Sequence, residues 1–310
     1  MIIKRLFVIV TIICAVFIAL PIFAAGVYQD FTYDTKEDGT IIISKYNGNA
    51  ENVTVPSEID GQPVTALGEN VFYNNKQVRS ITIPSGVTST GFGTFIFCEN
   101  LEQVDLPDTI TQMGNQTFYM CTSLKSVRIP KGMTEVNHGT FKYCDGLQEV
   151  ILHDGITEIR ASSFQFCKSL QSINIPESVK FIGDYAFADC ESLTNVKLPS
   201  TLESIGDFAF QYCGALTGIK LPDGLQTIGF AAFTSCRELK EISIPESVTS
   251  IGQLAFNRCD LMLKVSIYSP NTKIGKETFR KCSLAIVYAH KESTGEAYAK
   301  ANKMPLVYLN

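Results

Sequence analysis

The chain has 310 residues, of which 45% are hydrophobic and 18% are charged, and its formal net charge is −5. Such a composition folds rather than staying disordered, and its acidic balance lacks the basic footprint of a nucleic-acid-binding protein. Only three histidines are present, which leaves little material for histidine-based catalysis.

Residues 1–25 are predicted to be an export signal. Lys4 and Arg5 form a short positive region, residues 6–23 are apolar and uncharged, and residues 24–26 are small. This order is typical of a secretory signal peptide. The apolar run of 18 residues lies at the lower edge of what spans a bilayer, so an uncleaved membrane anchor stays open as an alternative. In both cases we expect the rest of the chain to be secreted or at the cell surface.

Residues 26–63 are expected to form an N-terminal cap that contains a β-hairpin. Asp38-Gly39 is a signal for a two-residue hairpin turn between two strand-like runs. In the second run, a period of two places Ile41, Ile43 and Lys45 on one face. A cap is expected because the open end of a repetitive core would otherwise face water.

Residues 64–288 repeat a pattern of 23 residues, for which PSTLESIGDFAFQYCGALTGIKL at 199–221 is representative. A fixed period of this length predicts a solenoid, in which coils stack on one continuous core. Each coil is expected to hold a short strand with alternating buried residues, and a proline ends that strand because it cannot donate a ladder hydrogen bond. The Ala-Phe pair is expected in a short helical turn on the outer side, with the ring pointing inward.

A glycine column within the repeat has two interpretations. The glycine provides either a turn with positive φ or a close approach between coils. Asn137, which stands in this column, fits the turn because asparagine tolerates the left-handed region. Arg160, in the next coil, fits neither interpretation.

Nine cysteines also recur at the interval of 23 residues, namely Cys98, Cys121, Cys144, Cys167, Cys190, Cys213, Cys236, Cys259 and Cys282. Stacked coils place equivalent Cα atoms about 4.8 Å apart, which is within the disulfide range. The number is odd, however, and Asn75 fills the same position in the first coil. Buried thiols that act as small apolar fillers are therefore the preferred interpretation. Structural zinc is disfavoured because each coil offers one ligand where four are needed.

The last part of the chain, residues 289–310, is expected to cap the far end of the solenoid. Residues 293–301 are predicted to form a short helix, and residues 306–309 read as an apolar run that follows it.

The repeat Pro-x-x-Leu-x-x-Ile-Gly-x-x-Ala-Phe-x-x-Cys-x-x-Leu-x-x-Ile-x-Leu resembles the BspA-type, or treponemal-type, leucine-rich repeat over about residues 31–290. The resemblance implies a right-handed leucine-rich repeat solenoid with a parallel sheet on its concave face and short helical turns outside. About ten coils of 23 residues fit into this region. The resemblance also implies a surface or secreted protein associated with adhesion to host matrix proteins and to other cells. It supplies no catalytic residue and no cofactor.

The same resemblance places recognition on the strand residues that point outward. This stripe is polar and mixed in charge, its lysines lie toward the C-terminal half, and it contains no aromatic anchor. The predicted ligand-binding residues are Gln103, Asp105, Ser126, Arg128, Glu149, Ser172, Asn174, Asn195, Lys197, Lys220, Glu241, Ser243 and Lys264. A merely solvated sheet face is the alternative interpretation.

Two functions stay open at this point. The first is protein–protein or cell-adhesion interaction, with a protein or glycan partner on a host or neighbouring cell surface. The second is a structural surface-coat or spacer protein that self-associates. An enzyme is not expected, because neither a nucleophile–base pair nor a metal-ligand cluster stands out in the sequence. Nucleic acid is not an expected partner, no cofactor or metal site is predicted, and membrane contact is expected only through the N-terminal segment.

Overall fold

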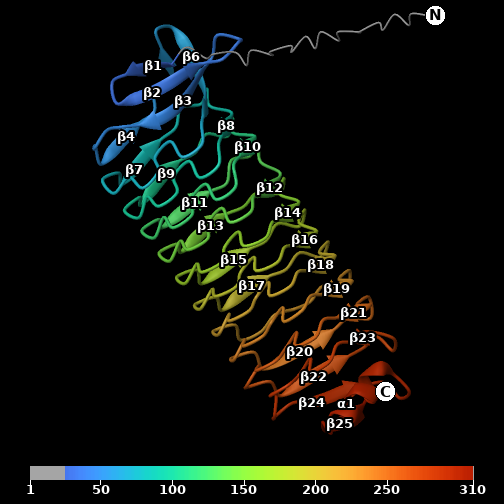
Figure 1. Ribbon diagram of the computed structural model, residues 1–310. Helices are drawn as coiled ribbons and strands as arrows, with labels where there is room; N and C mark the ends of the chain where they lie inside the picture. The colour runs from blue at the N-terminus through green and yellow to red at the C-terminus, as the bar shows by residue number, and fades with distance from the viewer. Residues whose placement is uncertain (1–24, 310) are drawn as a thin grey trace, which may run out of the picture.

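The 23-residue repeat folds into a stack of coils with strands on two sides, and a cap covers each end (Figure 1). The computed structural model describes residues 25–309. The predicted signal peptide, residues 1–25, therefore lies outside the described residues except for Ala25, which begins strand β1 (Ala25–Tyr28). No helix among the described residues is both long and apolar enough to cross a membrane.

The first side of the stack carries the strands that the alternating pattern predicts, and we call it the strand face. Its strands are β4 (Asn52–Thr54), β7 (Ser80–Thr82), β9 (Gln103–Asp105), β11 (Ser126–Arg128), β13 (Glu149–Ile151), β15 (Ser172–Asn174), β17 (Asn195–Lys197), β20 (Glu241–Ile244), β22 (Lys264–Ile267), β24 (Ile286–Ala289) and β25 (Leu306–Tyr308). Paired neighbours run parallel and one repeat apart, as Ile81 opposite Val104 illustrates.

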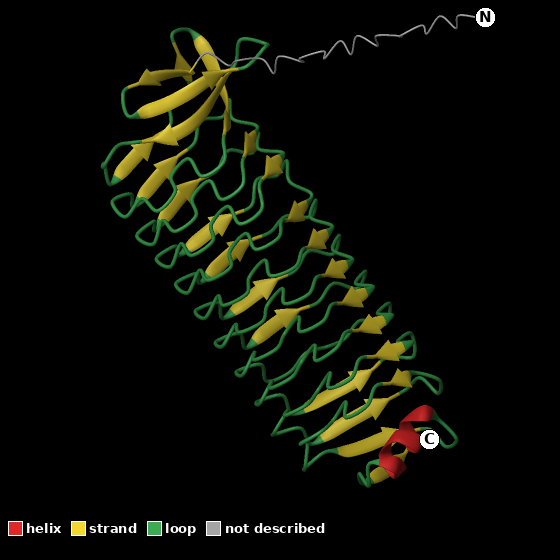
Figure 2. Cartoon of the chain, in the orientation of Figure 1, coloured by secondary structure: helices red, strands yellow, loops and turns green. Residues whose placement is uncertain are grey.

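The second side carries a ladder of two-residue strands, which we call the second ladder. They are β8 (Ser89–Thr90), β10 (Gln112–Met113), β12 (Glu135–Val136), β14 (Glu158–Ile159), β16 (Phe181–Ile182), β18 (Ser204–Ile205), β19 (Thr227–Ile228), β21 (Ser250–Ile251) and β23 (Lys273–Ile274). From β12 to β23 this ladder is one uninterrupted parallel sheet. Figure 2 shows both rows of strands and the loops that join them.

Phenylalanines and cysteines fill the space between the two rows. Ten phenylalanines form a buried spine, namely Phe72, Phe95, Phe118, Phe141, Phe164, Phe187, Phe210, Phe233, Phe256 and Phe279. Each coil places one ring on the next, as in Phe233 and Phe256, whose ring centroids lie 5.1 Å apart at 1° between planes. The ten coils marked by this spine agree with the predicted number, and the end strands extend the stack further.

The nine cysteines of the repeat are free and buried, in agreement with the thiol interpretation. Each Sγ lies 3.0–3.4 Å from the carbonyl oxygen of the phenylalanine in the preceding coil, as in Cys98 and Phe72. The thiol is therefore a donor that links adjacent coils as well as a small apolar filler. In the first coil Asn75 takes this place, and its amide donates to the carbonyl of Gly48 at 3.2 Å.

The segment around each phenylalanine consists of two successive turns rather than a helix. In one coil, Phe208 and Tyr212 adopt positive φ values of 58° and 59°. The N–H of Cys213 donates to the carbonyl of Phe210 within the same coil, whereas the N–H of Phe210 donates to the carbonyl of Ala232 in the next coil. In an α-helix each N–H donates to a carbonyl of the same helix. In these turns some of the N–H groups donate to the next coil instead, so the segment cannot be helical. The ring of Phe210 points inward, as predicted.

Close approach, and not positive φ, explains the glycine column. A Cβ at Gly114 would lie 2.2 Å from the carbonyl carbon of Gly91, the equivalent residue one coil earlier. The prediction for Asn137 is wrong, because this residue does not adopt a positive φ. The guanidinium of Arg160 pairs with Glu135 at 2.6 Å, but nothing in the structure explains how its Cβ fits the column.

The N-terminal cap contains the predicted hairpin, formed by β2 (Phe31–Thr35) and β3 (Ile41–Tyr46). Its turn is longer than predicted: the N–H of Lys36 donates to Thr40 at 2.8 Å, and Gly39 adopts a φ of 82°. This is the three-residue loop with a left-handed glycine. Strands β5 (Glu58–Ile59) and β6 (Gln62–Leu67) complete the cap.

A bulge changes the faces of β3. Thr32 pairs with Lys45 and Tyr33 pairs with Ile43, so Ser44 is left without a partner. An extra residue reverses the alternation of a strand beyond it. The prediction that Lys45 shares a face with Ile41 and Ile43 is therefore wrong: Tyr46 is buried instead and Lys45 is exposed.

The C-terminal cap contains the predicted helix as α1 (Thr294–Ala301). Ser293 caps its N-terminus, because its hydroxyl accepts a hydrogen bond from the N–H of Glu296 at 3.2 Å. The Glu296 carboxylate in turn contacts Lys300 at 2.6 Å and the hydroxyl of Tyr308 at 2.7 Å. These contacts hold α1 against strand β25 at the end of the stack.

Candidate ligand-binding surface

The predicted ligand-binding residues lie on the strand face and are exposed. All thirteen side chains, from Gln103 in β9 to Lys264 in β22, point away from the core. They are spread along the stack, so only residues of neighbouring coils come together. Strands hold the backbone of all of them except Lys220 in place, and their side chains take no part in the core.

The basic residues on this face fall into two classes. Arg128 in the N-terminal half is neutralised, because it pairs with Asp108 and donates to the carbonyl of Leu106 at 3.2 Å. Lys197 and Lys220 have no ion-pair partner among residues 25–309. The two lysines occupy the same position in adjacent coils. The free positive charge of the face is therefore concentrated around the coil that contains Lys220.

The strand-face pairing is broken between β9 and β11, between β13 and β15, and at this coil, which is the one that pairs with neither neighbour. Residues 218–220 form no strand, although they lie between β17 and β20 (Figure 2). No backbone hydrogen bond involves the N–H or C=O groups of residues 218–221. Gly218 accounts for the interruption, because glycine has no side chain to pack and weakens a strand interior. No other coil has glycine at this outward position.

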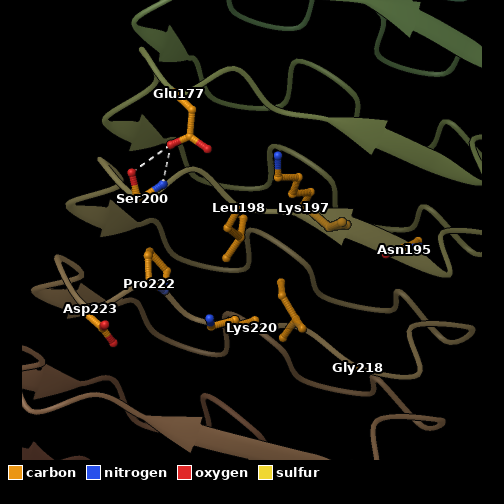
Figure 3. Close-up of a pocket in the computed structure, with 11 residues that line it drawn as sticks. Glu177, Asn195, Lys197, Leu198, Ser200, Gly218, Lys220, Pro222 and Asp223 are labelled. Atoms are coloured by element: carbon orange, nitrogen blue, oxygen red, sulfur yellow. Dashed lines mark hydrogen bonds between the residues drawn. The ribbon is translucent and has the colours of Figure 1, made fainter.

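Two hollows flank the interrupted coil. The first encloses about 450 Å³ and is lined by Lys197, Gly218 and Lys220, among others (Figure 3). The second encloses about 390 Å³ on the other side of the same coil and is bordered by Glu241 and Tyr268. Both volumes lie in the range of ligand-sized clefts.

Charge in the first hollow is arranged asymmetrically. The two lysines come from the end of the strand position, whereas Glu177 and Asp223 come from the position that follows the proline. Glu177 is already engaged, because its Oε2 accepts hydrogen bonds from the N–H and hydroxyl of Ser200 at 2.7 and 2.8 Å. These bonds lower the pKa of Glu177, so the carboxylate is charged at neutral pH.

The strand face ends in tyrosines that the sequence reasoning missed. Tyr268 is 39% exposed and Tyr288 is partly exposed, with the Lys264 ammonium 5.1 Å from its ring centroid. The predicted stripe, which holds no aromatic residue, ends before these tyrosines, and they extend the face at its C-terminal end. The last coil is one residue shorter, which sets Tyr288 opposite Ser266. Ala285 fills the buried leucine position of this coil and Leu284 is 53% exposed, so the missing residue falls after Ala285.

A second feature that sequence reasoning missed is an aromatic row on the turns. Its members are Tyr73, Phe97, Tyr119, Tyr143 and Phe166, and consecutive ring centroids lie 5.7, 5.6, 5.5 and 4.5 Å apart. Tyr73 at one end is 58% exposed. Tyr73 and Tyr119 follow the spine phenylalanine of their coil by one residue and the other three follow it by two, so no single repeat column reveals the row. We refer to these five residues as the aromatic row.

The described part of the chain holds no group of three or more histidine, cysteine, aspartate or glutamate side chains that could bind a metal ion.

Comparison with known proteins finds leucine-rich repeat sequences and structures. The pattern described as the BspA type leucine rich repeat region, in six copies, matches residues 45–171 and 157–285. A search of curated proteins gives no significant match.

Among solved structures, a leucine-rich repeat protein from Bacteroides ovatus is 27% identical, with a TM-score of 0.63 over 92% of this chain and 76% of that chain. The T. pallidum leucine rich repeat protein is 28% identical, with a TM-score of 0.50 over 69% of this chain and 90% of that one. A leucine rich cell surface protein from Faecalibacterium prausnitzii is 26% identical, with a TM-score of 0.49 over 89% and 97%.

Proposed function

This chain belongs to the BspA-type leucine-rich repeat family, and from that premise we propose that it is an exported or cell-surface protein that mediates adhesion. The proposed partners are proteins of a host or of the extracellular matrix, held by the strand face. The apolar N-terminal segment with Lys4 and Arg5 supports export.

The observation that carries the proposal is the concentration of unpaired lysines beside two hollows on this face. Lys197 and Lys220 have no ion-pair partner among the described residues and border the larger hollow. Cationic groups without internal partners attract acidic surfaces and accelerate encounter with them. Tyr268 and Tyr288 extend the same face with the aromatic surface that protein interfaces favour.

The experiment reverses the charge of Lys197, Lys220 and Lys264 to glutamate and measures binding to immobilised collagen, fibronectin and laminin. A matched variant reverses the charge of Lys45, Lys273 and Lys303, which are exposed and do not belong to the predicted ligand-binding residues. We expect the first variant to lose at least tenfold in affinity for the bound matrix protein and the second to keep it. Equal binding by the two variants would contradict the proposal.

A second function, self-association in a surface coat, is favoured by the aromatic row. Tyr73 is exposed and the other four side chains of the row are partly exposed, and a contiguous apolar surface of this kind marks an interaction surface. Light scattering on dilution separates the two functions. A concentration-dependent mass that falls when Tyr73 and Phe97 are changed to serine would favour the coat, and a constant monomer mass would favour adhesion by single chains.

A further inference from the structure

We propose that the interrupted coil at Gly218 is a docking site for a short extended peptide segment that carries acidic side chains. The inference rests on the proposed function and specifies the chemistry of its partner. Three features of this coil support it: the unpaired backbone of residues 218–221, the hollows beside that backbone, and the charged side chains that line the hollows.

The backbone of this coil is free, although its position in the stack is fixed. In some coils the N–H of the residue before the proline crosses to the next coil, as the N–H of Ile129 does to the carbonyl of Ile151 at 3.0 Å, whereas Leu106 and Leu198 make no such bond. Leu221 makes none either, and residues 218–221 differ from the other coils because they lack strand-face bonds toward both neighbouring coils. The side chains of Ile219 and Leu221 nevertheless remain buried. The coil thus keeps its core contacts while its unpaired backbone groups border the hollows on its two sides.

The space beside the free backbone is open on both sides. An added Cβ at Gly218 would meet no atom within 4 Å. Hollows of about 450 and 390 Å³ share Gly218, Ile219, Lys220 and Asp223 in their walls. Glycine at this position therefore serves no packing need, and its effect is to leave the backbone uncovered.

A peptide matches these groups better than an acidic glycan does. Free N–H and C=O groups that follow one another along an extended segment are complementary to the alternating donors and acceptors of another peptide. No aromatic ring lines the first hollow, so it lacks a stacking platform for a sugar ring. Peptide recognition by exposed backbone takes its affinity from such main-chain bonds and its specificity from side chains.

Charge selects the side chains of that peptide. Lys197 and Lys220 line the first hollow at the end of the strand position, and both lack an ion-pair partner among residues 25–309. Glu177 and Asp223 line it at the position that follows the proline. Acidic side chains are therefore attracted toward the two lysines and repelled by the two carboxylates, which gives the bound peptide a preferred orientation.

The test uses fluorescence anisotropy with labelled eight-residue probes. They are an alternating Glu-Val peptide, the same peptide with N-methylated valines, an alternating Lys-Val peptide, and heparin as an acidic glycan competitor. We expect the Glu-Val peptide to bind at least tenfold more tightly than either other peptide. N-methylation removes main-chain donors without changing charge, so its loss of affinity distinguishes backbone docking from simple charge attraction.

Two threonine variants provide the matched pair. Gly218→Thr places a strand-forming residue in the gap, and Gly214→Thr makes the same change four residues earlier. Neither position has positive φ, and at neither would a Cβ meet an atom within 4 Å. We expect Gly218→Thr to lower the affinity for the Glu-Val peptide at least tenfold without lowering the thermal midpoint, and Gly214→Thr to leave the affinity unchanged.

Hydrogen exchange gives an independent readout. The amides of residues 218–221 are expected to exchange faster than those of residues 241–244 in β20, and to slow when the Glu-Val peptide is added. The inference is overturned if the Glu-Val peptide does not bind at 1 mM, if N-methylation has no effect, if heparin displaces it by binding the same site, or if Gly218→Thr binds normally. The proposed function is tested separately by the variant with Lys197, Lys220 and Lys264 reversed. If that variant loses binding to matrix proteins while any of the results above is obtained, the adhesion proposal is supported and only the peptide site is rejected.

Discussion

Truncation of Phe187 to alanine tests whether the phenylalanine spine holds the solenoid together. The ring is fully buried, and it stacks at 5.1 Å on Phe164 and at 5.2 Å on Phe210, with 7° and 9° between planes. Phenylalanine-to-alanine changes in a core cost about 3–5 kcal/mol. Because each aromatic pair adds about 0.5–1.5 kcal/mol beyond burial, we expect a loss at the upper end of that range.

Urea unfolding followed by far-ultraviolet circular dichroism measures the effect. Phe181→Ala is the matched control, since this phenylalanine of β16 is 42% exposed and its truncation should cost less than about 1 kcal/mol. Phe187→Leu keeps most of the apolar volume and should lose less than half as much as Phe187→Ala. The reasoning is refuted if Phe187→Ala and Phe181→Ala lower the free energy of unfolding equally.

Two further predictions concern ionisable groups. Burial raises the pKa of the Cys98 thiol to about 12 and raises those of Cys121 and Cys190 as well, and the thiolate is the reactive form. Ellman's reagent at pH 8 should therefore find the eight cysteines from Cys98 to Cys259 unreactive in the native protein and reactive in urea. Rapid labelling of most of them in the native protein would contradict the thiol ladder. Hydrogen bonds from Lys300, the Tyr308 hydroxyl and the N–H of Glu292 lower the pKa of Glu296 to about 2. Since the folded pKa lies below the usual value of 4.5, the stabilisation is present above pH 4.5 and disappears as the pH falls toward 2. Glu296→Gln should accordingly lower the thermal midpoint at pH 7 and match the unmodified protein near pH 2, whereas a constant difference across this range would count against the assignment.

The strand positions and the core residues of each coil could be predicted from the residue types that repeat, because each of these types has a characteristic structural role. Proline ends a strand, and alternating apolar residues bury one side of it. Phe210 and Cys213 recur because their positions face the core. These features place the outward columns as well, which is why the predicted ligand-binding residues are all exposed.

The turns were less predictable, because their conformation does not depend on residue type. Phe208, Tyr212 and their equivalents in other coils adopt positive φ without being glycine, although this costs roughly 1–2 kcal/mol per residue. The bonds that they make to the next coil offset that cost. Such a compensation depends on the neighbouring coil and leaves no mark in a single repeat.

Breaks in the pattern carried the rest of the information. Ser44 reverses the faces of β3, and the short last coil brings Tyr288 onto the strand face. The sequence shows that Gly218 is the one glycine in its column. It does not show that the nearby backbone groups are unpaired, because that depends on the hydrogen-bond partner of each group in the folded chain. The sequence therefore placed the predicted residues on the exposed side of the strands, but it did not show the unpaired backbone and the hollows beside Lys197 and Lys220.

The interruption at Gly218 is tolerated because three other connections cross it. The second ladder continues from β18 to β19, the Cys236 thiol reaches the carbonyl of Phe210 at 3.2 Å, and the rings of Phe210 and Phe233 stack at 5.1 Å. A hydrogen bond between strands contributes only about 0.5–1.5 kcal/mol net, so the strand-face bonds of one coil can be absent without unfolding the stack. The same bonds remain to be gained when a peptide supplies their partners. A repeat protein can thus vary its binding surface by interrupting one ladder, provided that its core and its second ladder continue.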